Sequence, residues 1–253
     1  MTQRGVAVVT GAAGGLGRAF CERLTARGYA VVGADLAGAD ERLDVTDPQA
    51  CRELARRVQP DVWVNNAGVL GAGSVAEQPD AEIERVVAVN LLGVVHGSRA
   101  AVEVMRARGS GHILNVGSLA SWVPVPGEVI YAATKHAVQA FTVGLAAELR
   151  GTGIRVSLLC PDGIWTPMLH DRLADPAASL SFSGRRLLSA DEVAARGVAL
   201  IERGSGVLTI GSLPRSRAVL CRLLGIVPEL SLRLFPVFDA LGRRNQRRLR
   251  VGR

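Results

Sequence analysis

Six short apolar runs recur along the chain, and between them lie longer stretches in which apolar residues have helical spacing. The runs are rich in Val, Ile and Leu and are nearly continuous. A strand of this kind is buried on both faces, as happens when helices cross over between parallel strands on each side of a sheet. The pattern therefore predicts an α/β fold with a single doubly wound parallel sheet and helices on both faces. The predicted strands are Val6–Thr10, Ala30–Ala34, Val62–Asn65, His112–Val116, Ile154–Leu159 and Val207–Ile210.

The length and composition fit one domain with a C-terminal extension. A chain of 253 residues with 48% hydrophobic and 21% charged residues is able to pack around a single core. We expect the sheet-bearing domain to cover residues 1–211 and the extension to cover 212–253. Between about 165 and 190 the sequence changes to Pro, Ser and Asp with scattered apolar residues. This composition indicates a mobile flap over a ligand more than a core element.

The positive charge of the chain is concentrated in the extension. The net charge is +7, yet residues 212–253 hold ten Arg against Glu229 and Asp239, so the rest of the chain sums to about −1. A chain of this balance is not expected to bind nucleic acid. Arginines and apolar residues alternate in the extension, where Pro228 and Pro236 are expected to prevent a single straight helix. The extension fits peripheral contact with an anionic membrane and packing across a subunit interface equally well.

The positions of cysteine and histidine predict neither disulfides nor a metal site. The four cysteines lie far apart without paired spacing, and the four histidines share no ligand spacing. The chain passes from Thr2 almost at once into the first predicted strand, without the basic and apolar segments of a signal peptide. We therefore expect free thiols, no metal ion and a cytoplasmic location, with any membrane association made through the extension.

A glycine-rich turn that contains Gly11, Gly15 and Gly17 follows the first predicted strand and precedes a stretch of helical character at Arg18–Arg27. Glycines let the backbone turn sharply and approach a pyrophosphate, whose charge is stabilised by free amides at a helix N-terminus. Such a turn alone also serves as an ordinary strand–helix connection. Asp35, however, closes the second predicted strand eighteen residues after Gly17. A carboxylate at this point accepts the hydroxyls of an adenosine ribose.

The carboxylate of Asp35 also predicts which dinucleotide binds. A negative charge there repels the 2′-phosphate of NADP, and no Arg or Lys stands directly beside Asp35 in the sequence to bind that group. The sequence therefore predicts NAD as the cofactor, in preference to NADP.

Tyr131 and Lys135 lie one helical turn apart, and Lys135 is the only lysine in the chain. Oxidising an alcohol requires a base for the hydroxyl proton while a hydride leaves the same carbon. A phenol with a pKa of about 10 is a poor base at neutral pH, and a neighbouring cation lowers that pKa. A compact ammonium is able to contact both the phenolate and the nicotinamide ribose, which a guanidinium would do differently. The pair predicts Tyr131 as the base and Lys135 as the group that lowers its pKa.

Together these features resemble the short-chain dehydrogenase/reductase family, from residue 5 to about 211. The turn matches the family's TGxxxGxG motif, residues 65–68 match its NNAG segment, and Tyr131 to Lys135 match its YxxxK motif. Ser118, thirteen residues before Tyr131, matches its serine. The resemblance implies a Rossmann-type dinucleotide-binding fold, an oxidoreductase acting on CH–OH groups, and assembly into homodimers or homotetramers.

The resemblance also implies the site residues. Ser118, preferred to Ser121, would bind the substrate oxygen, and Asn90 would hold a water that links the catalytic lysine to solvent. Residues 161–166 resemble the family's PGxxxT segment beside the nicotinamide, although Asp162 stands where glycine is usual, which leaves the local backbone shape open. The implied cofactor-binding residues are Gly11, Gly15, Leu16, Gly17, Asp35, Asp44, Val45, Asn66, Ala67, Gly68, Tyr131, Lys135, Ile164 and Thr166.

Apolar residues in the flap and after the strands predict a lipophilic substrate, a steroid-like or long-chain alcohol or ketone. The expected pocket residues are Trp122, Trp165, Met168, Leu169 and Phe182. Two other functions stay open. An acyl-thioester ketoreductase of lipid synthesis is supported by the arginine-rich extension and opposed by Asp35. A catalytically silent dinucleotide-binding scaffold protein is opposed by the intact catalytic residues.

Overall fold

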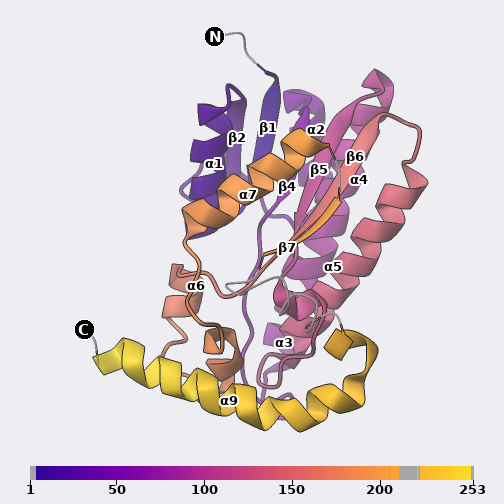
Figure 1. Ribbon diagram of the computed structural model, residues 1–253. Coiled ribbons are helices and arrows are strands. Elements are labelled where there is room, and N and C mark those ends of the chain that lie inside the picture. Colours follow the sequence, from indigo (N-terminus) through magenta and orange to yellow (C-terminus); the bar gives the residue numbers. More distant parts are fainter. Residues whose placement is uncertain (1–3, 205, 211–220, 222, 252–253) are drawn as a thin grey trace.

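The computed structural model describes residues 4–204, 206–210, 221 and 223–251 (Figure 1). Within these residues seven strands form one sheet, in which every neighbouring pair is parallel. The single doubly wound sheet that the sequence predicts is confirmed. The strands are β1 (Val6–Thr10), β2 (Ala30–Asp35), β3 (Glu41–Arg42), β4 (Val62–Asn65), β5 (Gly111–Val116), β6 (Ile154–Pro161) and β7 (Gly206–Ile210).

Strand β3 was not predicted from the sequence. It has two residues, Glu41 and Arg42, which pair with Ala34 and Asp35 of β2 at the edge of the sheet. Two charged residues give no apolar periodicity, so only the pairing with β2 identifies them as a strand. The six predicted strands are all present, with ends that differ by one or two residues.

Alternate residues of the strands face two helical layers. On one face Val9, Leu114 and Leu159 are buried with apolar residues of α1 and α7. On the other face Val8 and Ile113 are buried with apolar residues of α2, α4 and α5. Both faces are covered, which explains the nearly continuous apolar character of the six predicted strands. The layers are α1 (Gly15–Ala26) and α7 (Ala190–Arg203) on the first face, and α2 (Pro48–Val58), α4 (Gly93–Arg108) and α5 (Val129–Glu148) on the second.

The strand order, β3-β2-β1-β4-β5-β6-β7, reverses direction between β1 and β4. Successive strands run outward from β1 to β3, and the chain then returns to place β4 on the other side of β1. The loops that leave these two strands diverge, so a crevice forms at their carboxyl ends, where open α/β sheets bind their ligands. The glycine-rich turn after β1 and the NNAG segment after β4 both begin at this point.

A continuous helical stretch positions Asn90 beside the loop that follows β4. It consists of α3 (Asp80–Val87), a π-helical segment η1 (Ala88–Leu92) and α4. By length and composition alone, the stretch Asp80–Arg108 is apolar enough to cross a membrane. Its apolar character has another explanation, because Ala101 and Met105 of α4 are fully buried against the sheet.

Helix α1 begins at Gly15, three residues before the start that the sequence indicates. Gly15 and Gly17 therefore lie within the first helical turn, although glycine disfavours helix interiors. The approach of the turn to the helix explains why glycine is needed there. A Cβ on Gly17 would lie 2.0 Å from the carbonyl oxygen of Gly11.

The segment from about 165 to 190 has a small core of its own. It contains α6 (Pro167–His170) and η3 (Pro176–Phe182), and its buried residues Leu169, Leu173 and Phe182 pack together. The prediction that this segment is a flap without core character is therefore wrong on that point. Its apolar residues look scattered in the sequence because the turns between them are short, and only the folded segment brings them together.

The described part of the extension is dominated by one helix, α9 (Pro228–Val251), which crosses below the carboxyl ends of the strands (Figure 1). Residues 223–226 are helical, Val227 is not, and α9 starts at Pro228, so the prediction that the prolines prevent a single straight helix is confirmed at Pro228. Pro228 begins the helix, where a missing N–H removes no internal hydrogen bond. Pro236 lies inside the helix, which continues beyond it. The predicted boundary near residue 211 and the start of the extension at 212–220 lie outside the described residues.

Close packing against η3 holds α9 in place. A Cβ on Gly242 would lie 1.9 Å from the carbonyl oxygen of Ser179, so glycine is required for this approach. The hydroxyl of Ser179 donates to Asp239 of α9. The Gln246 amide donates to the carbonyl of Asp175 at 2.9 Å. These contacts make the extension a cover over the flap segment.

Candidate active site

One cavity of about 940 Å³ lies at the carboxyl ends of the strands and runs from the glycine-rich turn to α9. Every one of the cofactor-binding residues implied by the family resemblance lines it. The cavity also brings Ser118, Tyr131 and Lys135 together, although they come from the β5–η2 connection and from α5. The contact of these residues with a cofactor stays a prediction, but the fold places them around one space.

The glycine-rich turn forms the phosphate end of this cavity. Gly11 has φ +68, in the left-handed region, and a Cβ there would lie 2.8 Å from the Cα of Ala67. No side chain caps the start of α1, and its first turn holds no acidic residue. The amides at this helix end are therefore available to an anion, as binding of a pyrophosphate requires. The residues present fit the phosphates of a dinucleotide.

Thr10 and Asn66 join this turn to the NNAG segment. The Thr10 hydroxyl accepts from the backbone amides of Asn66 at 3.0 Å and Ala67 at 3.1 Å. The Asn66 side-chain amide donates to the carbonyl oxygens of Thr10 and Gly11. Two connections that leave neighbouring strands are thereby fixed to each other across the switch point.

Asp35 closes the adenosine end of the cavity. One carboxylate oxygen accepts from the amide of Ala13 in the glycine-rich turn at 2.9 Å, and the other accepts from the amide of Leu36 at 2.7 Å. The carboxylate is thus held beside the turn and faces the cavity. Arg18 lines the same cavity, so the fold provides a cation that the sequence around Asp35 does not reveal.

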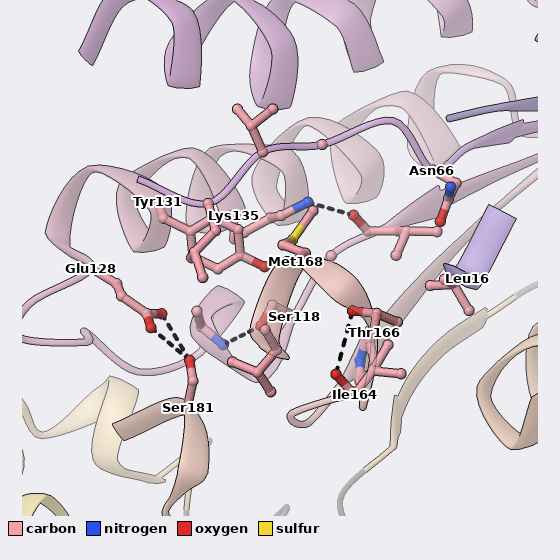
Figure 2. Close-up of a pocket in the computed structure, with 18 of the residues that line it drawn as sticks. Leu16, Asn66, Ser118, Glu128, Tyr131, Lys135, Ile164, Thr166, Met168 and Ser181 are labelled. Atoms are coloured by element: carbon pink, nitrogen blue, oxygen red, sulfur yellow. Dashed lines mark hydrogen bonds between the residues drawn. The ribbon is translucent and has the colours of Figure 1, made fainter. Parts of the chain in front are cut away.

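Lys135 is the buried cation of the site. Its side chain is 5% exposed, and its ammonium donates to the carbonyl oxygen of Val116 at the end of β5, at 2.9 Å (Figure 2). The ammonium lies 5.6 Å from the centre of the Tyr131 ring. Burial lowers the pKa of Lys135 from 10.5 to about 8, because removal of water disfavours the charged form.

Tyr131 lies one turn before Lys135 on α5 and points toward Ser118 (Figure 2). Burial raises the pKa of the Tyr131 phenol well above its ordinary value, and the nearby carboxylate of Glu128 raises it further. The hydrogen bond with Ser118 lowers it. The sequence predicts that Lys135 lowers the pKa of Tyr131, whereas in the structure the lowering comes from the hydrogen bond with Ser118. The reason is geometric, since the ammonium of Lys135 is directed to the Val116 carbonyl.

Ser118 and Ser121 have different positions in the short helix η2 (Leu119–Ser121). Ser118 precedes this helix, lines the cavity and accepts from the amide of Ala120. Ser121 is fully buried, and its hydroxyl accepts from the amide of Ser118 at 3.2 Å. The geometry therefore favours Ser118 as the serine that contacts substrate and gives Ser121 a supporting position.

Asn90 lies in the π-helical segment η1 and is fully buried. Its amide group makes two hydrogen bonds of 2.8 Å with the backbone of Val69, as donor to the carbonyl and as acceptor from the N–H. Asn90 is not among the residues that line the cavity. In this structure it fixes the loop after the NNAG segment, and the water-holding role implied by the resemblance stays a prediction. Wide helical turns of this kind are frequent at functional sites.

Sequence reasoning missed Glu128, which precedes α5 and also lines the cavity. Its side chain is buried, and both carboxylate oxygens accept from the hydroxyl of Ser181, at 2.8 and 2.9 Å (Figure 2). Burial raises the pKa of Glu128 to about 7. A signal was present in the sequence, since Glu128 is an acidic residue only three positions before Tyr131 in an otherwise apolar stretch.

The substrate end of the cavity differs from the prediction. Met168 and Leu169 line it, but Trp122, Trp165 and Phe182 do not. Trp122 packs against a buried cluster that includes Val138, Leu158 and Cys160, and Trp165 is 41% exposed and contacts His170 edge-on. Phe182 belongs to the core of the flap segment. Apolar residues from the η2 region, the flap and the extension take their place: Leu119, Val123, Val125, Leu180, Leu224, Phe235 and Phe238.

The segment after β6 brings Asp162 to the wall of the cavity. The carboxylate of Asp162 accepts from the amide of Gly163 at 2.9 Å, so the substituted residue folds onto its own loop. Ile164 and Thr166 line the cavity, and a Cβ on Gly15 would lie 3.1 Å from the Thr166 methyl. Across the described ranges, no group of three His, Cys, Asp or Glu is placed to hold a metal ion.

Comparison with known proteins agrees with this geometry. The model of the short chain dehydrogenase family matches residues 5–177. The chain belongs to this family. It is 39% identical to 1-deoxy-11-beta-hydroxypentalenate dehydrogenase of Streptomyces avermitilis, over 76% of this chain and 79% of that protein. It is 31% identical to the 3-oxoacyl-(acyl-carrier-protein) reductase FabG of Escherichia coli, over 75% of this chain and 86% of that protein.

Among solved structures, a putative NAD(P)-dependent gluconate 5-dehydrogenase from Beutenbergia cavernae, with bound NADP, is 28% identical. It has a TM-score of 0.74, and the alignment covers 83% of this chain and 96% of that one. The chain is therefore an oxidoreductase of a family that acts on alcohol and ketone groups and binds NAD(P). The comparisons give the family's chemistry, whereas the substrate depends on the lining of the cavity.

The raised pKa of Glu128 predicts how stability depends on pH. The folded state holds the proton up to about pH 7, whereas the ordinary pKa of 4.5 applies to the carboxyl group in the unfolded chain. Stability from this group is therefore present below pH 4.5 and is lost as the pH rises toward 7. Glu128→Gln, which cannot ionise, should gain about 3 kcal/mol relative to the unmodified protein over that interval.

Denaturant unfolding from pH 5 to pH 8 measures this difference. Glu148→Gln, at an exposed position near the end of the same helix, controls for the change in net charge. A stability difference between Glu128→Gln and the unmodified protein that does not grow with pH would contradict the buried, protonated carboxyl.

Proposed function

We propose that this protein is an NAD-dependent oxidoreductase that interconverts a secondary alcohol and a ketone on a lipophilic substrate, with Tyr131 as the proton-transfer group. The observation that carries the proposal is the single cavity in which a phosphate-binding turn, the Ser118–Tyr131–Lys135 group and an apolar end adjoin. The order of these parts along the cavity matches the order of a dinucleotide followed by its substrate.

Tyr131 and Ser118 bind the substrate oxygen in this proposal. The Tyr131 phenol removes the hydroxyl proton of an alcohol, or returns one to a ketone, and the Ser118 hydroxyl stabilises the charge that develops on the oxygen. The bound nicotinamide supplies the acceptor or donor of the hydride at the same carbon. Because burial raises the pKa of Tyr131, the protein alone favours the neutral phenol. Oxidation should therefore speed up as the pH rises.

Lys135 supports this proton transfer as a nearby cation with an adjusted pKa. A pKa of about 8 lets the group hold or release a proton close to neutral pH. Its hydrogen bond to the Val116 carbonyl keeps the ammonium beside the ring of Tyr131. In this proposal Lys135 stabilises the phenolate once it forms and binds the nicotinamide ribose.

The substrate half of the cavity supports a lipophilic substrate. Its lining residues are apolar side chains from three separate segments, among them Met168, Leu180 and Phe235. Glu128 and Ser181 are polar residues of this lining, and they bond to each other. A relative at 39% identity is named for dehydrogenation of a hydroxypentalenate compound, which is consistent with a bulky carbon skeleton.

A second candidate, an acyl-thioester ketoreductase that uses NADPH, is favoured by one structural observation. Arg18 lines the same cavity as Asp35 and offers a cation for a 2′-phosphate. Similarity to the E. coli 3-oxoacyl-(acyl-carrier-protein) reductase points the same way. We favour the first candidate because the Asp35 carboxylate is fixed by two amides where it would meet that phosphate.

Replacement of the proposed base tests the reaction. Tyr131→Phe should lower turnover of hydrophobic secondary alcohols by roughly 10²- to 10⁴-fold, the usual contribution of general acid–base catalysis. Binding of the dinucleotide should remain, because the phenyl ring is retained. Nicotinamide absorbance measures turnover, and fluorescence titration measures binding.

Tyr29→Phe is the matched control, since Tyr29 is the only other tyrosine in the chain and lies just before β2. Its turnover should equal that of the unmodified protein. Undiminished turnover in Tyr131→Phe would show that another group moves the proton. Absence of any turnover in the unmodified protein, over a broad panel of alcohols and ketones, would favour the silent scaffold.

Kinetics with both dinucleotides test the assignment of the cofactor. The ratio of kcat/KM should favour NAD over NADP by at least about ten-fold, equivalent to about 1.4 kcal/mol. Asp35→Asn should reduce this preference because it removes the repelling charge. Asp80→Asn, at an exposed position outside the cavity, should leave it unchanged. A ten-fold preference for NADP in the unmodified protein would favour the ketoreductase.

A further inference from the structure

Helix α9 has an inner face that closes the substrate end of the cavity. Ser231, Phe235 and Phe238 recur at intervals of three and four residues, and all three line the cavity. Farther along the same face, Gly242 and Gln246 pack against the flap segment. Contacts within the chain therefore hold α9 by this inner face.

A flanking face of α9, next to the inner face, is apolar and exposed. Leu230, Leu234, Val237 and Leu241 have the spacing i, i+4, i+7 and i+11, which places them on one stripe. Leu230, Val237 and Leu241 are 41%, 63% and 39% exposed, and Leu234 is partly buried. The helical residues 223–226 and Val227, which precede α9, add exposed apolar side chains at positions 223, 226 and 227. A continuous exposed stripe of this kind marks an interaction surface, whereas single exposed apolar residues do not.

Arginines flank and continue this stripe. Arg233 lies beside it, and Arg244, Arg247 and Arg248 follow it along the last turns of the helix. All four side chains are exposed, and none takes part in an ion pair with another described residue. The acidic residue in the middle of the helix, Asp239, is already engaged by Ser179 and Arg243. The outward surface is therefore both apolar and cationic.

We propose that the outer face of α9 docks on the surface of an anionic phospholipid bilayer, with the leucine and valine side chains inserted among the acyl chains and the arginines against the phosphates. A helix with this division of apolar and cationic groups binds in the interface plane of a membrane. The proposal rests on the surface alone and not on the proposed reaction.

Charge distinguishes a bilayer from a second copy of this chain as the occupant. Two copies that met through this face would bring Arg244, Arg247 and Arg248 of both chains into one interface. The face offers no unengaged carboxylate at its centre to neutralise them, since Asp239 is paired within its own chain. Burial of unpaired guanidinium groups is costly, whereas anionic lipids supply the matching charge.

Docking in this orientation would place the cavity close to the lipid. Phe235 and Phe238 line the cavity on the inner face of α9, and the exposed Val237 and Leu241 lie on the flank beside that face. The same helix would then border both the cavity and the membrane. A lipophilic molecule dissolved in the bilayer would have a short path to the substrate end.

Vesicle flotation with the full chain tests the proposal. The protein should float with vesicles that contain phosphatidylglycerol and phosphatidylcholine and should float at least about ten-fold less with phosphatidylcholine alone. Raising the salt concentration from about 0.1 M to about 0.5 M should weaken the binding, because the charges are exposed. The double variants Val237→Glu/Leu241→Glu and Arg244→Glu/Arg248→Glu should each reduce binding by at least about ten-fold.

Val143→Glu is the matched control, since Val143 is a 50% exposed valine on another helix, α5. This variant should float as the unmodified protein does. Circular dichroism melting verifies that each variant is folded, and nicotinamide absorbance follows activity separately. Equal flotation of the outer-face variants and the unmodified protein would overturn the proposal. Absence of binding to any vesicle would also overturn it. If sedimentation then showed that the outer-face variants dissociate a dimer, the face would be identified as a contact between copies.

Discussion

The burial of one ammonium group at the carboxyl end of β5 is the constraint on which the site depends. Lys135 is the only lysine of the chain, and its charge is removed from water and held by the carbonyl oxygen of Val116. An ammonium in this position requires α5 to lie against the end of the sheet, which also places Tyr131 beside Ser118. Burial is costly for a charged group, and the lowered pKa of Lys135 expresses that cost. The lowered pKa also lets the ammonium release its proton close to neutral pH.

A chain of hydrogen bonds connects this catalytic group with the phosphate end of the cavity. Thr10 at the end of β1 binds the amides of Asn66 and Ala67, and Asn90 binds the backbone of Val69. Connections that leave separate strands therefore hold one another in register, and the amides of Asn66, Ala67 and Val69 that take part belong to residues that line the cavity. Such a scaffold keeps the cofactor end fixed, while the substrate end is built from the flap segment and α9.

The sequence predicted those parts of the fold that depend on local patterns. Continuous apolar runs identified six strands, and the glycines near Gly17 identified a turn in which a side chain would collide with the backbone. The substrate end depends on tertiary packing, which explains the errors there. Phe182 is apolar because the flap segment has its own core, and Phe235 lines the cavity because α9 returns across the sheet. A sequence pattern shows that such residues are apolar, but it does not show which space they fill.

The single lysine makes a direct measurement of the central constraint feasible. Protein labelled with ¹³C at the ε carbon of lysine gives one side-chain resonance, which can be followed by NMR as the pH is raised. The account predicts that this resonance titrates at about pH 8, as expected for a buried ammonium at Lys135. A titration at the ordinary value of 10.5 would show that the ammonium is in water, and it would contradict the arrangement of Lys135, Val116 and Tyr131 described above.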